Sequence, residues 1–175
     1  MKTALHSIAV MCLFLFFICP DTLHAAPSIR RQIDLALMGN QPLESVRAVS
    51  QFPRSQLIQE GIEVEANLAA GYDEVIHIRF DPALHFHGAS TQEVILSFDN
   101  PYKNFHALVY GVFAGDLDSF VQHLALKPGT PANTHAIGKY NRPLSASTGC
   151  PITLGASPID STHFVFGTGW CNGDQ

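Results

Sequence analysis

Residues 62–80, IEVEANLAAGYDEVIHIRF, contain two stretches of alternating apolar and polar side chains, separated by turn-forming residues at 69–73. Such alternation predicts two strands with one buried face each, joined as an antiparallel hairpin. One register matches apolar with apolar and charged with charged side chains: Val64 with Ile78, Ile62 with Phe80, Glu65 with His77 and Glu63 with Arg79. A slip by one residue would lose every match, so the pattern predicts this register alone.

The segments around the hairpin predict further strands and helices. Strands are expected at 93–99, 105–113, 134–141 and 162–169, and helices at 28–38, 43–51 and 116–126. Asp116 is a good N-cap for the last helix, and Lys127-Pro128-Gly129 is expected to end it. Because 105–113 is apolar on both faces, we expect it to be a central strand whose second face is covered by this helix. The fold prediction is an α+β domain: an antiparallel sheet of five or more strands packed by one or two helices.

Residues 1–25 are typical of a signal peptide. Lys2 precedes an uninterrupted apolar run from Ile8 to Ile18, which is too short to span a bilayer, and Ala25 offers a cleavage site. The sequence therefore predicts an exported single domain over residues 26–175, secreted or periplasmic, with no membrane span once the leader is removed. Arg30-Arg31 is either a processing site or, as we favour, two exposed arginines in the first turn of a helix.

The cysteines outside the leader form one pair. Cys150 and Cys171 lie in the turn-rich segments TGCPI and GWCNG, and they match no CxxC metal or redox motif. In an oxidising compartment such a pair is expected to form a disulfide. We therefore predict that one Cys150–Cys171 bond stabilises the domain, with a metal-binding or catalytic thiol pair as the alternative.

Charge composition argues against two classes of partner. The net charge is −5, and charged residues make up 14% of the chain, well below the usual quarter. A chain of this kind has no basic patch for nucleic-acid phosphates or for an anionic membrane surface. We therefore expect a protein or small-molecule partner and no nucleic acid.

Histidine is unusually frequent, with nine in the chain. In an extended segment the side chains of His85 and His87 would share a face, so both imidazoles could bind one Cu or Zn ion. His106 or His163 is a candidate third ligand. The alternative is a histidine pair in a loop after Pro82, with Phe86 packed into the core between them, and no cofactor.

The polar side of the hairpin offers a second candidate site, made of Glu65, His77, Arg79 and His106. A carboxylate beside an imidazole suits general acid–base chemistry. The alternative is a set of cross-strand ion pairs on an exposed sheet face. The sequence contains no G-x-S-x-G elbow.

These observations favour a secreted or periplasmic non-enzymatic binding protein, such as an inhibitor, effector or accessory factor. Two alternatives stay open. One is a periplasmic Cu/Zn-binding protein that uses His85 and His87, and the other is a hydrolase-type enzyme with a His/carboxylate site.

Overall fold

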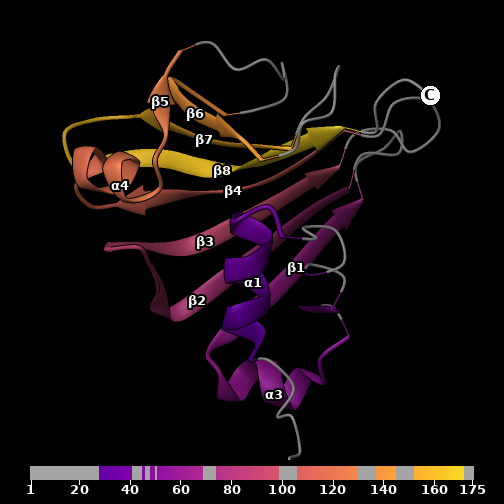
Figure 1. The fold of residues 1–175 in the computed structure, drawn as a ribbon. Helices are drawn as coiled ribbons and strands as arrows, with labels where there is room; N and C mark the ends of the chain where they lie inside the picture. The colour runs from indigo at the N-terminus through magenta and orange to yellow at the C-terminus, as the bar shows by residue number, and fades with distance from the viewer. Residues whose placement is uncertain are drawn as a thin grey trace, which may run out of the picture.

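The computed structural model describes residues 28–40, 45, 48–49, 51–68, 74–98, 106–129, 137–144 and 152–171. In these ranges the strands form one eight-stranded antiparallel sheet in the order β1-β2-β3-β4-β8-β7-β6-β5 (Figure 1). The strands are β1 (Ile62–Leu68), β2 (Glu74–Phe86), β3 (Ala89–Phe98), β4 (His106–Ala114), β5 (Lys127–Pro128), β6 (Tyr140–Pro143), β7 (Thr153–Pro158) and β8 (His163–Cys171). The helices described are α1 (Ile29–Leu37), α3 (Arg54–Gln59) and α4 (Leu117–His123). The predicted α+β class and antiparallel sheet are confirmed.

The β1–β2 hairpin has the predicted register. Ile62 pairs with Phe80, Val64 with Ile78, Glu63 with Arg79 and Glu65 with His77. Ile78 is fully buried, whereas Glu63 and Glu65 are exposed. The register could be predicted because one face of the hairpin is buried, so that a shift by one residue would move the apolar side chains out of the core.

Helix α1 lies within the predicted range 28–38. The Ser28 hydroxyl accepts a hydrogen bond from the Arg31 amide at 3.2 Å and caps the helix. Ile29, Ile33 and Leu37 are fully buried along one side, as their spacing predicts. In the predicted helix 43–51, Ser45, Ala48 and Val49 are helical, and most of the rest lies outside the described residues. None of the helices described is long and apolar enough to cross a membrane.

Arg30 differs from the prediction that both arginines of the pair are exposed. Its guanidinium is partly buried and donates to the carbonyl oxygens of Pro82 at 2.9 Å, Glu60 at 3.1 Å and Ala83 at 3.4 Å. It also lies 5.4 Å from the ring centre of Phe80. One side chain thus ties α1 to the end of α3 and to β2.

Helix α4 corrects two predictions. Asp116 caps it as expected, but the helix ends at His123, and Lys127-Pro128 forms strand β5 instead of a simple stop. Phe120 contacts the rings of Phe86, Phe113, Phe164 and Phe166, with centroids 4.8–6.2 Å apart. Because those rings belong to the core that also contains α1, α4 lies on the same side of the sheet as α1 and does not cover the second face of β4.

The remaining strand predictions are confirmed in part. Residues 163–169 of the predicted strand 162–169 lie in β8, which continues to Cys171, pairs with β4 and occupies the middle of the sheet. Of 134–141, residues 140 and 141 begin β6, and 134–136 lie outside the described residues. Strand β7 was not predicted from the sequence. Cys150 and the side chain of Cys171 also lie outside the described residues, so the disulfide stays a prediction.

The sheet thus has two unlike faces. One face carries the core and both α1 and α4. We call the other the open face, because no helix among the described residues covers it; its side chains include Glu63, Glu65, His77, Arg79, Glu93, Ile95, Tyr110, Val112, His163 and Val165.

Candidate functional site on the open face of the sheet

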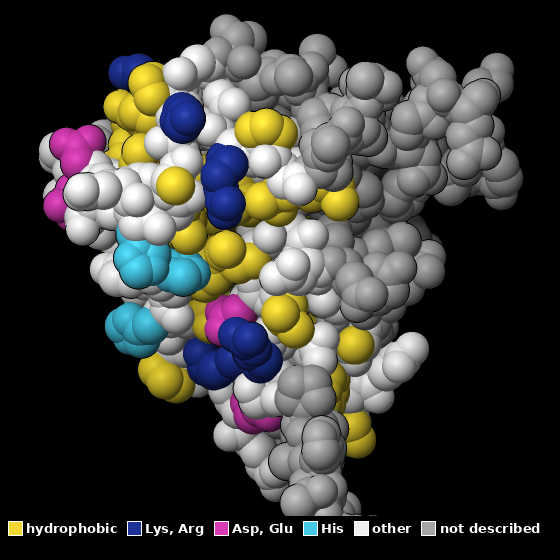
Figure 2. Space-filling model, in the orientation of Figure 1, with side chains coloured by type: hydrophobic (Ala, Val, Ile, Leu, Met, Phe, Trp, Pro, Cys, Tyr) yellow, Lys and Arg dark blue, Asp and Glu magenta, His cyan; other side chains and the backbone are white. Residues whose placement is uncertain are grey.

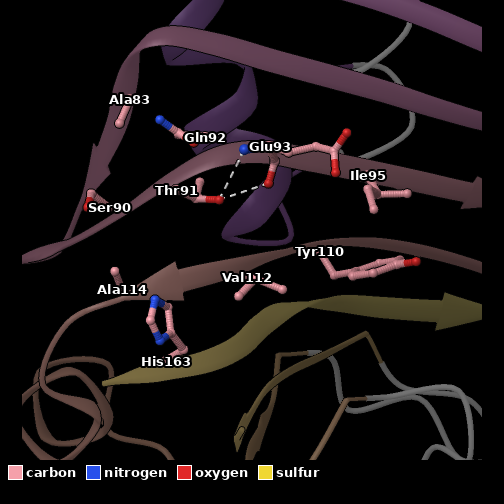
Figure 3. Close-up of a pocket in the computed structure, with 10 residues that line it drawn as sticks. All are labelled: Ala83, Ser90, Thr91, Gln92, Glu93, Ile95, Tyr110, Val112, Ala114 and His163. Carbon is pink, nitrogen blue, oxygen red and sulfur yellow. Dashed lines mark hydrogen bonds between the residues drawn. The ribbon is translucent and has the colours of Figure 1, made fainter. Parts of the chain in front are cut away.

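A cavity of about 430 Å³ lies on the open face, across β2, β3, β4 and β8 (Figure 3). Its lining mixes polar and apolar groups: Ala83, Ser90, Thr91, Gln92, Glu93, Ile95, Tyr110, Val112, Ala114 and His163. Val112 is 49% exposed, which is unusual for a valine in a central strand. A strand that is apolar on both faces therefore contributes one face to the core and the other to this cavity.

Glu93 joins the cavity to a cluster of charged side chains on β1 and β2. Its Oε1 lies 3.0 Å from His77 Nδ1 and 3.2 Å from Arg79 Nε. Arg79 also donates to Glu65 at 3.2 Å and lies 4.0 Å from Glu63. The pKa of Arg79 is raised, mainly by its hydrogen bond to Glu65. One guanidinium on β2 is therefore shared among three carboxylates from the two neighbouring strands, β1 and β3.

Glu65, His77 and Arg79 of the predicted polar site lie together on the open face, but their contacts differ from the predicted ones. Glu65 and His77 are opposed in the register, yet Glu65 binds Arg79 and His77 contacts Glu93. The twist of neighbouring strands brings diagonal partners within reach, and β3 supplies a carboxylate beside β2. His106 is the first residue of β4, and its side chain lies outside the described residues.

Sequence reasoning missed Glu93, although a signal was available. The alternation of Glu93, Ile95 and Ser97 with the core residues Val94 and Leu96 predicts that Glu93 lies on the face away from the core. It does not predict which strand lies next to Glu93. The Thr91 hydroxyl donates to the Glu93 carbonyl at 2.8 Å and accepts from its amide at 3.2 Å (Figure 3). A side chain at Gly111 would come within 2.6 Å of that carbonyl, so glycine allows the close strand approach here.

Asp160 positions His163 at the β8 edge of the cavity. Its Oδ1 accepts from the backbone amides of Thr162 and His163, both at 2.7 Å, and lies 3.2 Å from His163 Nδ1. The backbone hydrogen bond from Thr162 is the main cause that lowers the pKa of Asp160 to about 2. The turn before β8 therefore carries a fixed negative charge next to the imidazole.

His85 and His87 lie at the end of the β2–β3 hairpin. β2 continues past Pro82 to Phe86, so this segment is a strand and not the loop considered above, although Phe86 is buried as expected. His87 has a φ of 49° and begins a two-residue turn with Gly88, which has a φ of 84°. The imidazole of His87 lies 4.7 Å from that of His123 on α4, centre to centre. The imidazole of His87 is exposed but partly desolvated by its neighbours; this desolvation, and then the charge of His123, lower its pKa.

A second cavity, of about 380 Å³, includes both predicted histidines. Its lining is Arg31, Asp34, Leu35, Met38, Asn40, His85, Phe86 and His87. Burial raises the pKa of Asp34, whose Oδ1 is buried without a hydrogen-bond partner among the described residues. Within the described ranges, no three His, Cys, Asp or Glu side chains are grouped closely enough to hold a metal ion.

His77 and Glu93 form an imidazole–carboxylate pair, which is the start of an acid–base site. However, Arg79 shares the same carboxylate oxygen, and among the described residues no hydroxyl is hydrogen-bonded to His77. A nucleophile beside a base is what hydrolytic sites of the triad type require. Among the described residues, a triad of that type is therefore not assembled at the His77–Glu93 pair.

No protein-family model, curated protein or solved structure matches this chain.

Proposed function

We propose that the protein is an exported, non-enzymatic binding protein that holds its partner on the open face of the sheet. The observation that carries the proposal is the cavity of about 430 Å³ on that face, in which apolar side chains adjoin a fixed cluster of charges. Ligand sites commonly combine an apolar lining with a few positioned polar groups. Export rests on the apolar leader and the cysteine pair of the sequence.

The charges of the open face favour a partner with positive charge. Four carboxylates lie on this face or at its β8 edge, those of Glu63, Glu65, Glu93 and Asp160. Arg79 is the cation that contacts three of them. Val112, Ile95 and Tyr110 offer apolar surface beside the charges. We therefore expect the partner to be a protein segment in which lysine or arginine flanks an apolar or aromatic side chain, because opposite potentials attract such a segment.

A pair of synthetic peptides tests this proposal. One peptide alternates lysine with leucine and tyrosine, and the other replaces each lysine with glutamate. We expect fluorescence anisotropy to detect binding of the basic peptide, which weakens as salt rises because exposed charges are screened. Equal binding of the acidic peptide would contradict the proposed charge complementarity.

Two matched variant pairs locate the binding surface. Glu63→Gln/Glu65→Gln should weaken binding, whereas Glu60→Gln/Asp118→Asn, with the same change in net charge away from the open face, should not. Val112→Ser should also weaken binding, whereas Ile58→Ser, at a residue 66% exposed on α3, should not. If both members of either pair had the same effect, the open face would not be the binding site.

A further inference from the structure

The contact between His87 and His123 joins two elements that are distant in the sequence. His87 belongs to the β2–β3 turn, and His123 is the last residue of α4. Figure 2 shows histidine side chains gathered at the edge of the molecule where α4 and the end of the β2–β3 hairpin lie. Both residues are exposed. This pair is separate from the open-face cavity, and the inference does not depend on the proposed function.

The spacing of the two rings fits chelation of one metal ion. Their centroids are 4.7 Å apart, and their planes are inclined by 46°. Two imidazoles bound to one ion through N–metal bonds of about 2.0–2.1 Å, at angles of about 90–110°, have centroids roughly 4.5–5.2 Å apart. The observed centroid separation falls in this range, so the two rings are spaced as two ligands of one ion are.

The backbone on both sides of the pair is held by the same buried cluster. Phe86 precedes His87, and its ring centroid lies 6.2 Å from that of Phe120. Phe120 in turn lies one helical turn before His123. Phe86 also contacts His87 edge-on, with centroids 4.4 Å apart. Because Phe86 and Phe120 are both in the core, the turn and the helix keep a fixed relative position. Such support raises the affinity of a metal site, because the ligand-bearing backbone does not have to become ordered when the ion binds.

We propose that His87 and His123 form a two-histidine chelate for a divalent transition metal, Cu²⁺ or Zn²⁺, with water in the remaining positions. Imidazole is a common ligand of both ions. The proposed site pairs histidines from two elements, whereas the metal hypothesis from the sequence paired His85 with His87. Exposure of both imidazoles leaves room for the water ligands.

The test uses the full chain, purified without a polyhistidine tag and titrated with CuCl₂ or ZnCl₂ alone. His87→Asn keeps a residue that tolerates the positive φ of the turn, and His123→Gln keeps a good helix former. We expect each variant to weaken binding at the first equivalent by about tenfold or more, because each removes half of the protein ligands. Copper should bind more tightly than zinc.

His85→Ala and His163→Ala are the matched controls, since each removes an exposed histidine outside the pair. We expect both controls to bind the first equivalent as the unchanged chain does. In NMR spectra, substoichiometric Cu²⁺ should broaden the imidazole signals of His87 and His123 before those of other histidines. Unchanged affinity in both pair variants, or a loss as large in His85→Ala, would overturn the proposal. Thermal unfolding of each variant without metal distinguishes loss of the site from loss of the fold.

Discussion

At the scale of single residues, Arg30 connects three elements through backbone carbonyls. The carbonyl of Glu60 that it binds belongs to the C-cap residue of α3, where the helix leaves acceptors unpaired. The carbonyls of Pro82 and Ala83 lie where the β2–β3 register shifts between Arg79 and Leu84. The Arg30 guanidinium therefore donates to carbonyl oxygens that are not paired within α3 or within the regular part of the β2–β3 ladder.

Arg30→Ala should thus destabilise the protein by about 1–2 kcal/mol, since hydrogen bonds from a charged group are lost and carbonyls are left without this donor. Arg31→Ala should change the free energy of unfolding by less than about 0.5 kcal/mol, as is usual for an exposed surface side chain. Urea denaturation of both variants measures the difference. Equal midpoints would show that the carbonyl contacts of Arg30 contribute nothing.

Asp160 predicts a pH effect whose sign follows from its lowered pKa. The pKa is about 2 in the folded chain, against an ordinary value of 3.8, so the folded state favours the carboxylate. This contribution to stability is fully present above pH 3.8 and is lost as pH falls through about 2. We expect Asp160→Asn to lower the melting temperature at pH 6. The difference in melting temperature between the variant and the unchanged chain should disappear between pH 4 and 2. A difference that did not change with pH would mean that ionisation of Asp160 has no part in stability.

At the scale of elements, the β1–β2 hairpin separates a core face from a charged face within one strand pair. Ile78 is fully buried, and its neighbours His77 and Arg79 belong to the open-face cluster. Adjacent residues of β2 therefore have different tasks: one packs the core and the others position charges. Since the side-chain period of a strand is two, both tasks depend on the same register.

Ile78→Ala should destabilise the protein by about 2–4 kcal/mol, because it leaves a cavity in a packed core. Glu63→Gln should change stability by less than about 0.5 kcal/mol, since exposed ion pairs contribute little. Chemical denaturation followed by circular dichroism gives both values. Similar losses for the two variants would contradict the assignment of faces.

At the scale of the whole molecule, the described helices cover one side of the sheet, and no helix among the described residues lies on the other. The aromatic cluster around Phe120 and the buried side of α1 fill the core side. The open face presents exposed Val112 beside three carboxylates that contact one arginine. Antiparallel sheets commonly leave one polar face in solvent, so it is the cavity with exposed Val112 on this face that supports the binding proposal.

The predicted Cys150–Cys171 disulfide also acts at this scale. It would close a loop of about 20 residues around β7 and β8, a constraint of about 3 kcal/mol in the chain-entropy account. Thiol titration of the unfolded, unreduced exported protein should find no free thiol at these two positions. Two reactive thiols would exclude the bond and favour the metal or redox alternative for the pair.

The sequence by itself determined which residues face the core in the main strands and helices, and also the register of β1 with β2. Local periodicity and caps decide those features, as the Asp116 cap and the burial of Ile29, Ile33 and Ile78 illustrate. Only the tertiary structure decided which strands are neighbours. It placed Glu93 beside His77, β8 beside β4, α4 on the same side as α1, and His87 against His123. The physical reason is that alternation reports whether a side chain is buried, but not which distant segment buries it. That choice depends on how the complete core packs.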